Sequence, residues 1–193
     1  MGLEVELKAH VSDHVSLKQR IETLSGISSA VCEYKQDTYF CLAGEDALFR
    51  MRLEKSGPSF DAMQGLLFFT HKDKTLRKGI EVNEEVEFCC PSSQGPSALQ
   101  FFLNLGYEVF ITKTKRGYHY TYPIGQDLPP MTVELVEVFG LGWFLEMEFV
   151  LDDTAKVEQA RDCLLNALDQ VGIDHAMIEE EYYMHMLKKK PEA

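Results

Sequence analysis

Charged side chains spaced two residues apart recur along this 193-residue chain. The first of them, Glu4, Glu6 and Lys8, alternate with apolar residues. Successive side chains of a β-strand point to opposite faces, so these three charges would share one face of a strand whose other face is apolar. Further pairs repeat the spacing with one sign of charge in each: Arg50 and Arg52, Lys72 and Lys74, Glu85 and Glu87, Lys113 and Lys115, and Glu146 and Glu148. The pattern predicts several strands with one charged face.

Two interpretations of these charged faces are open. Each could be the solvated face of an antiparallel sheet, which commonly has one wet side. Alternatively, a sheet that curls until these faces meet would enclose a channel lined by both signs of charge. Carboxylates in such a channel could hold a hard cation such as Mg²⁺ or Mn²⁺, and lysine and arginine side chains could hold a polyanion. The recurrence of the pattern, with the signs kept apart strand by strand, favours the channel.

The opening charges also belong to a longer, ordered set of motifs. Glu4, Glu6 and Lys8 match the N-terminal Glu-x-Glu-x-Lys of the CYTH superfamily, which joins class IV adenylyl cyclases with thiamine and inorganic triphosphatases. Further matches follow in order at residues 37–40, 48–52, 72, 85–87, 105–107, 113–116 and 140–148 and around Tyr183. The chain therefore resembles this superfamily over essentially its whole length. Its Gly-Leu-Gly-x-Phe-x-Glu stretch is most similar to the class IV cyclase branch.

The resemblance implies a fold and a set of site residues. The fold is α+β, a closed antiparallel β-barrel of about eight strands with flanking helices, as a single domain over residues 1–193. Lys8 and Glu134 are expected to act in catalysis. The expected substrate-binding cations are Arg50, Arg52, Lys72, Lys113, Lys115 and Arg116. The expected metal ligands are Glu4, Glu6, Glu146 and Glu148, with Glu85 and Glu87 as accessory carboxylates that hold a second ion or orient the cations.

The expected reaction consumes a triphosphate with the help of Mg²⁺ or Mn²⁺. In a cyclase, the ribose 3′-hydroxyl of ATP attacks the α-phosphate and yields cyclic AMP and pyrophosphate. In a triphosphatase, water attacks a terminal phosphate of an inorganic, thiamine or nucleoside triphosphate. The overall resemblance favours the class IV adenylyl cyclase, with the triphosphatase as the alternative. A catalytically silent module that binds polyphosphate or nucleotides is a third interpretation.

One position departs from the cyclase pattern. Relatives of that branch commonly carry an aspartate four residues before the first glycine of the Gly-Leu-Gly motif, where this chain has Val136. Glu134 would lie on the same strand face and could replace that aspartate, whereas Glu137 would point to the opposite face. Either Glu134 substitutes for the carboxylate, or the site lacks part of its metal-binding or general-base function.

Composition bounds the expected partners and location. The net charge is −12, which argues against a nucleic-acid duplex as partner but not against a small polyanion in an enclosed site. No apolar run reaches the roughly 18 residues needed to span a bilayer, and no secretory signal opens the chain, so a cytoplasmic protein without a membrane partner is expected. Five cysteines without a zinc-type spacing favour reduced thiols. ATP or tripolyphosphate is the expected partner, and a homodimer is compatible with the sequence.

Strands and helices must alternate irregularly to position the charged pairs. Beyond the opening strand, strands are expected near residues 31–41, 47–54, 66–72, 80–90, 107–122, 131–138 and 143–151. Helices are expected after Ser12 or Asp13, over 97–105, over 152–172 and over 175–189. The histidines show no metal-ligand spacing, and most are expected at the surface: His10, His14, His71, His119, His175 and His185.

Overall fold

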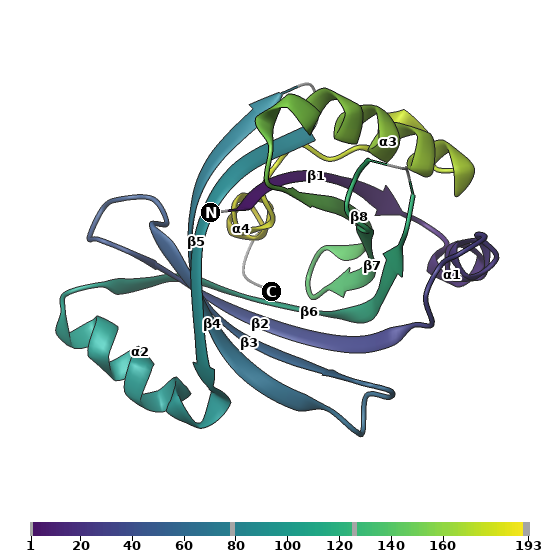
Figure 1. Cartoon of the computed structure of the whole chain (residues 1–193). Coiled ribbons are helices and arrows are strands. Elements are labelled where there is room, and N and C mark those ends of the chain that lie inside the picture. The colour runs from purple at the N-terminus through teal and green to yellow at the C-terminus, as the bar shows by residue number, and fades with distance from the viewer. Residues whose placement is uncertain (1, 78–79, 125–126, 191–193) are drawn as a thin grey trace.

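Antiparallel strands pair into a closed ring in the computed structural model, which describes residues 2–77, 80–124 and 127–190, with backbone alone for residues 73–77 and 80–84. The strands are β1 (Gly2–Val11), β2 (Val31–Cys41), β3 (Phe49–Gly57), β4 (Gln64–Arg77), β5 (Ile80–Pro91), β6 (Glu108–Tyr122), β7 (Met131–Val138) and β8 (Gly142–Leu151). Their order around the ring is β1-β5-β4-β3-β2-β6-β7-β8 (Figure 1). β1 pairs with β5 on one side and with β8 on the other, which closes the ring. The expected barrel is confirmed.

The opening strand shows how the sequence produces the two faces of the barrel. Val5 and Leu7 of β1 are fully buried and pack with the apolar residues of helices outside the ring. Glu4, Glu6 and Lys8 line the interior instead. The register places Glu6 opposite Glu148 of β8 and Lys8 opposite Glu146. Because paired residues share a face, the charges of β1 and β8 meet inside the barrel.

Four α-helices flank the barrel in the part of the chain that the structure describes: α1 (His14–Glu22), α2 (Gly95–Asn104), α3 (Val157–Gln170) and α4 (Tyr183–Lys188). α1 begins after Asp13, whose side chain accepts a hydrogen bond from the Ser16 backbone N–H. α1 and α3 contribute to a core outside β1, β6, β7 and β8. α2 covers a second core, on β2, β3 and β4, around Phe40 and Phe69 (Figure 1). Among the described residues, every helix is too short or too polar to cross a bilayer.

The C-terminal segment differs from the helix predicted over residues 175–189. α4 spans only Tyr183–Lys188, and the chain from 179 to 182 is not helical. Ile178 forms an antiparallel bridge with Ala9, and the Glu179 backbone N–H donates to the Lys8 carbonyl at 2.9 Å. β5 pairs with β1 only as far as Glu6, so backbone groups of β1 beyond that point can bond to the C-terminal segment. These bonds replace the helical ones and bring α4 to the barrel interior.

Candidate active site

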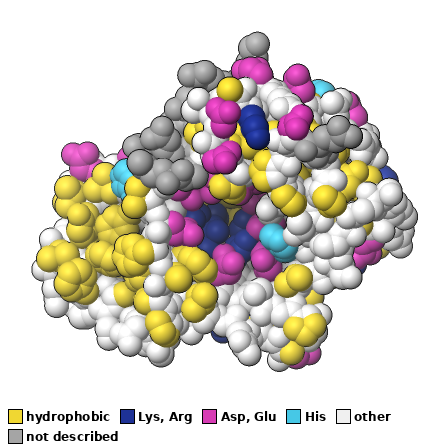
Figure 2. All heavy atoms as spheres, in the orientation of Figure 1, with side chains coloured by type: hydrophobic (Ala, Val, Ile, Leu, Met, Phe, Trp, Pro, Cys, Tyr) yellow, Lys and Arg dark blue, Asp and Glu magenta, His cyan; other side chains and the backbone are white. Residues whose placement is uncertain are grey.

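The barrel interior holds a cavity of about 110 Å³ with charged walls. Figure 2 shows a hollow in which lysine and arginine side chains lie, with acidic side chains around them. The walls are formed by Glu4, Glu6, Lys8, Tyr39, Arg50, Arg52, Lys72, Glu85, Lys113, Lys115, Glu134, Glu146, Glu148, Tyr182, Tyr183 and Met184. The structure thus brings together all the site residues predicted from the sequence except Arg116 and Glu87.

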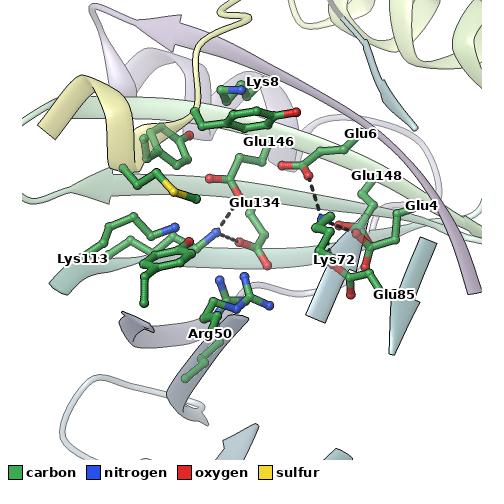
Figure 3. A pocket seen from close by; sticks show the side chains of 16 residues that line it. Glu4, Glu6, Lys8, Arg50, Lys72, Glu85, Lys113, Glu134, Glu146 and Glu148 are labelled. Atoms are coloured by element: carbon green, nitrogen blue, oxygen red, sulfur yellow. Dashed lines mark hydrogen bonds and ion pairs between the residues drawn. The ribbon is translucent and has the colours of Figure 1, made fainter. Parts of the chain in front are cut away.

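Three carboxylates gather at one side of the cavity, Glu4 and Glu6 from β1 and Glu148 from β8 (Figure 3). One oxygen of each lies within 4.8 Å of the others. Lys72 Nζ lies among them, 2.5 Å from Glu4 Oε2 and 3.8 Å from Glu6 Oε2. The same nitrogen is 2.8 Å from Glu85 Oε1. A lysine therefore serves as the counter-ion of this acidic group.

Burial makes the acidic group costly to ionise. It raises the pKa of Glu4 to about 7, even though Lys72 opposes the shift. Burial, followed by the charge of Glu4, also raises the pKa of Glu148 well above its usual value. Burial alone would lower the pKa of Lys72, but the Glu6 and Glu4 carboxylates raise it. Lys72 alone therefore does not compensate the group once all its carboxylates are ionised. A hard divalent cation such as Mg²⁺ or Mn²⁺, which prefers oxygen donors, would supply the missing positive charge.

Glu146, the fourth expected metal ligand, lies apart from the acidic group. Its Oε2 is 2.5 Å from Lys115 Nζ, which is also 2.9 Å from Glu134 Oε2. Burial would lower the pKa of Lys115, but Glu134 and Glu146 raise it. Glu146 Oε1 is buried and makes no hydrogen bond within the described part of the chain. Glu146 therefore has one oxygen engaged with Lys115 and one with unused hydrogen-bonding capacity.

Cationic side chains gather around Asp37 at another side of the cavity. Asp37 is fully buried on β2, with Arg52 Nε 2.6 Å from its Oδ1 and Lys113 Nζ 2.9 Å from its Oδ2. Burial would raise the pKa of Asp37, but Arg52 and Lys113 hold it well below its usual value. Arg50 is held differently, since its Nη2 donates to Thr70 Oγ1 at 3.1 Å and its buried Nε has no hydrogen bond to the described residues. Arg50 therefore keeps hydrogen-bonding capacity for an anion.

The prediction omits Asp37, although the sequence contains a signal for it. The buried residues of β2 alternate with the same two-residue spacing as the charged pairs: Glu33, Lys35, Asp37 and Tyr39. The prediction relied on like charges within each pair, whereas this run mixes both signs. A search for any charge at two-residue spacing would have found β2.

Arg116 does not lie in the cavity, and the expectation that it lines the channel is wrong. Its side chain is 54% exposed, and its Nη2 is 3.1 Å from Glu137 Oε2 on the outside of the barrel. The reason is the period of the strand. Lys113 and Lys115 face inward on β6, so the next residue, Arg116, must face outward.

Two other residues of the predicted charged pairs, Glu87 and Lys74, are not among the described residues that line the cavity. Glu87 accepts a hydrogen bond from Thr70 at 2.6 Å, but its side chain is 39% exposed and is not part of the cavity lining. The side chain of Lys74 lies outside the described residues.

An apolar cluster lies beside the charged cavity. Val136 of β7 packs there with Phe144 and Tyr183, and the rings of the last two meet edge to face at 4.8 Å. Glu134, two residues before Val136, lines the cavity, whereas Glu137 faces outward, as expected. The position at which cyclase relatives commonly carry an aspartate is therefore an apolar contact between β7, β8 and α4.

The sequence was compared with models of known protein families and with curated proteins. The family model of the CYTH domain matches residues 2–183 of the chain. No curated protein matches the sequence.

Solved structures with the same fold cover nearly the whole chain. The PH1819 protein from Pyrococcus horikoshii OT3 has a TM-score of 0.77 at 21% identity, covering 97% of this chain and 99% of that one. A candidate adenylate cyclase from Vibrio parahaemolyticus has a TM-score of 0.73 at 19% identity, covering 96% and 98%. A candidate adenylyl cyclase from Hippeastrum, described as revealing a dominant triphosphatase activity, has a TM-score of 0.63 at 13% identity, covering 97% and 95%. At these identities, the likeness establishes the fold.

Proposed function

Because the chain belongs to the CYTH domain family, we propose that it is a metal-dependent enzyme that hydrolyses a triphosphate bound inside the barrel. One observation carries this proposal: the cavity walls hold six carboxylates and six cationic side chains. Acidic residues gather around Glu4 and Glu148, while Arg50 and Lys113 lie on another side (Figure 3). A bound triphosphate would use both groups, because its oxygens pair with cations while a metal ion links it to carboxylates.

The balance of charge in the walls accounts for the proposed dependence on metal. A triphosphate alone would bring uncompensated negative charge into a buried and nearly neutral space, which is costly. Glu4, Glu6 and Glu148 would hold Mg²⁺ or Mn²⁺, which supplies positive charge and polarises a phosphoryl oxygen when bound. Lys72 would then leave Glu4 and become available to the phosphate chain.

Arg50 is the cation best suited to recognise phosphate. Its buried Nε makes no hydrogen bond to the part of the chain that the structure describes, and a guanidinium can contact two phosphate oxygens at once. Arg52 and Lys113 are held in place by Asp37 and would add positive charge with little loss of side-chain freedom. Lys8 lines the same cavity, and we assign it the role of binding the phosphate that leaves as product.

Glu134 is a poor candidate for the general base. Burial would raise its pKa, but Lys115 and Lys35 hold the pKa of Glu134 well below its usual value, so it binds a proton weakly. We assign Glu134 to positioning Lys115 beside Glu146. Glu146 Oε1, which has no hydrogen bond among the residues described, is better suited to accept one from the attacking water.

Two features favour hydrolysis over the cyclisation that the sequence resemblance favours. At the cyclase aspartate position, the chain has Val136, which belongs to an apolar cluster with Phe144 and Tyr183. In addition, the cavity of about 110 Å³ is small beside pockets for drug-sized ligands, which measure about 300–1,000 Å³. A phosphate chain and a water molecule need less room than ATP, whose ribose hydroxyl must also reach the α-phosphate.

Cyclisation of ATP is the second candidate because a smaller cleft of about 50 Å³ adjoins the cavity. The cleft shares Tyr39, Arg50 and Lys72 with the cavity and has an apolar wall that includes Leu48 and Phe49. A nucleoside placed there would leave its phosphates beside Arg50. The Hippeastrum protein, described as a candidate cyclase and as a triphosphatase, makes it necessary to measure both products.

A product analysis tests the proposal. Purified protein is given tripolyphosphate, thiamine triphosphate, ATP or GTP, each with Mg²⁺ or Mn²⁺, and orthophosphate and cyclic nucleotide are quantified. We expect orthophosphate from at least one substrate, only with metal, and no cyclic AMP. Cyclic AMP as the main product of ATP would replace hydrolysis by cyclisation. Binding of tripolyphosphate without turnover would identify a silent module.

A further inference from the structure

A second group of potential metal ligands lies elsewhere in the barrel, on β2, β6 and β7. Glu33, His119 and Glu134 each offer a ligand atom, and these atoms lie within 4.8 Å of one another. His119 Nδ1 is 3.5 Å from Glu33 Oε1 and 3.7 Å from Glu134 Oε1. Bonds of about 2.1 Å to a tetrahedral metal place its ligand atoms about 3.4 Å apart, so this spacing is already close to that of a coordination sphere.

Two atoms of this group are buried and make no hydrogen bond to any residue that the structure describes. One is Glu33 Oε2: Glu33 is only 7% exposed, and Lys35 Nζ is 2.7 Å from this oxygen but in poor geometry. The other is His119 Nδ1. Buried polar atoms are rarely left without a partner, because each loses its hydration. Glu134 already accepts hydrogen bonds from Lys35 and Lys115. A cation shared by the two carboxylates and the imidazole would satisfy the other two side chains as well.

Lys35 forms ion pairs with both carboxylates of the group, Glu33 and Glu134, and Lys115 pairs with Glu134 as well. Lys35 has another partner within reach, because its Nζ is 3.8 Å from Glu54 Oε2 on β3. A metal ion between Glu33 and Glu134 would repel the ammonium, and a short movement toward Glu54 would keep Lys35 paired. The fold therefore offers a position for the cation that the metal displaces.

We propose that Glu33, His119 and Glu134 bind one Zn²⁺ ion at a site separate from the carboxylate group of Glu4, Glu6 and Glu148. The mixed donor set decides the metal, because imidazole nitrogen suits Zn²⁺, whereas sites with oxygen alone suit Mg²⁺. Sequence spacing could not reveal this site, since its ligands come from three strands and the histidine is isolated in the chain. Most histidines were expected at the surface, whereas the Nδ1 atom of His119 is buried beside two carboxylates. The site shares Glu134 with the walls of the charged cavity, but the proposal does not depend on which reaction the cavity performs.

The test is a calorimetric titration of untagged, metal-free protein with Zn²⁺ in the presence of excess Mg²⁺. We expect one tight Zn²⁺ site in the parent protein. His119→Gln and Glu33→Gln should each weaken it by about tenfold or more. His10→Gln is the matched control, because His10 Nε2 also lies beside a carboxylate, 2.9 Å from Glu179 Oε2, and it should leave the tight site unchanged. Parental affinity in His119→Gln would overturn the proposal.

A second measurement needs no variant and covers the case in which a variant does not fold. X-ray absorption at the zinc edge of the parent protein with one equivalent of Zn²⁺ should show one imidazole nitrogen among oxygen ligands. A spectrum without imidazole, or with several imidazoles, would place the ion elsewhere and overturn the proposal.

Discussion

Lys72 Nζ lies 2.5 Å from Glu4 Oε2, inside the group of carboxylates where we place the hard metal ion. The lysine acts as an internal counter-ion, so lysine and metal compete for the same oxygens. Metal binding would therefore release a cation that can pair with phosphate. This exchange couples the binding of a metal to the binding of an anion.

Lys72→Met should destabilise the metal-free protein at pH 8 by about 3 kcal/mol, because the buried carboxylates of Glu4 and Glu85 lose their counter-ion. Urea unfolding measures the change. Lys55→Met, at an exposed lysine of β3, should change stability by no more than about 0.5 kcal/mol. Mg²⁺ should reduce the loss in Lys72→Met by replacing the missing charge. Equal stability of the parent and Lys72→Met without metal would show that the counter-ion role is wrong.

The affinity for Mg²⁺ should fall as the pH is lowered through neutrality. Burial raises the pKa of Glu4 to about 7, so a proton competes with the metal below that pH. Displacement of one proton predicts roughly tenfold weaker binding at pH 6 than at pH 8. Calorimetric titrations at constant ionic strength measure it. Equal affinity at the two pH values would contradict a metal site in which Glu4 is a ligand with a pKa of about 7.

The raised pKa of Glu4 also makes the stability of the metal-free protein fall as the pH rises. The folded pKa of Glu4 lies above its ordinary value of 4.5, so folding takes up a proton between pH 4.5 and about 7. The contribution of Glu4 to stability is therefore full below pH 4.5 and is lost as the pH rises through 7. Glu4→Gln should remove this part of the pH dependence in unfolding measurements.

Asp37→Asn should destabilise the fold by about 3–5 kcal/mol, since it leaves Arg52 and Lys113 buried without their carboxylate. Asp61→Asn, at an exposed aspartate of the β3–β4 connection, is the control and should be nearly neutral. Tripolyphosphate should offset much of the loss, because it would pair with the same cations. A neutral effect of Asp37→Asn on unfolding would contradict the anchoring role of Asp37.

Val136→Asp should yield no cyclic AMP, because the new carboxylate would lie in the apolar contact with Phe144 and Tyr183. Burial of an unpaired charge there should lower stability by several kcal/mol, to an extent that depends on pH. Val136→Ala, which keeps the site apolar, is the comparison. Products from ATP and the midpoint of thermal unfolding are measured for both variants. New cyclic AMP from Val136→Asp would support the cyclase interpretation instead.

The strand period and the resemblance to the CYTH superfamily together predicted the barrel and most of its lining. The strand period placed Glu4, Glu6 and Lys8 on one face of β1, and the same rule explains why Arg116 faces outward. Arg116 was included among the cations of the site because of its charge and its motif, although its position next to Lys115 places it on the opposite face of the strand.

Other parts of the site depend on contacts between distant segments, which local patterns do not encode. The helix predicted from residue 175 is interrupted because Ile178 and Glu179 bond to β1. The proximity of His119 to Glu33 depends on the register between β2 and β6 and on the curvature of the barrel. Neither can be read from the spacing of single residues.

The most direct test of the central claim is the release of orthophosphate from tripolyphosphate by the parent protein, Glu6→Gln and Glu137→Gln, each with and without Mg²⁺. Glu6 belongs to the acidic group of the cavity, whereas Glu137 faces outward beside Arg116. We predict Mg²⁺-dependent turnover in the parent and in Glu137→Gln, and a loss of about a hundredfold or more in Glu6→Gln. Undiminished turnover in Glu6→Gln, or turnover in the parent that does not depend on metal, would contradict metal-dependent hydrolysis inside the barrel.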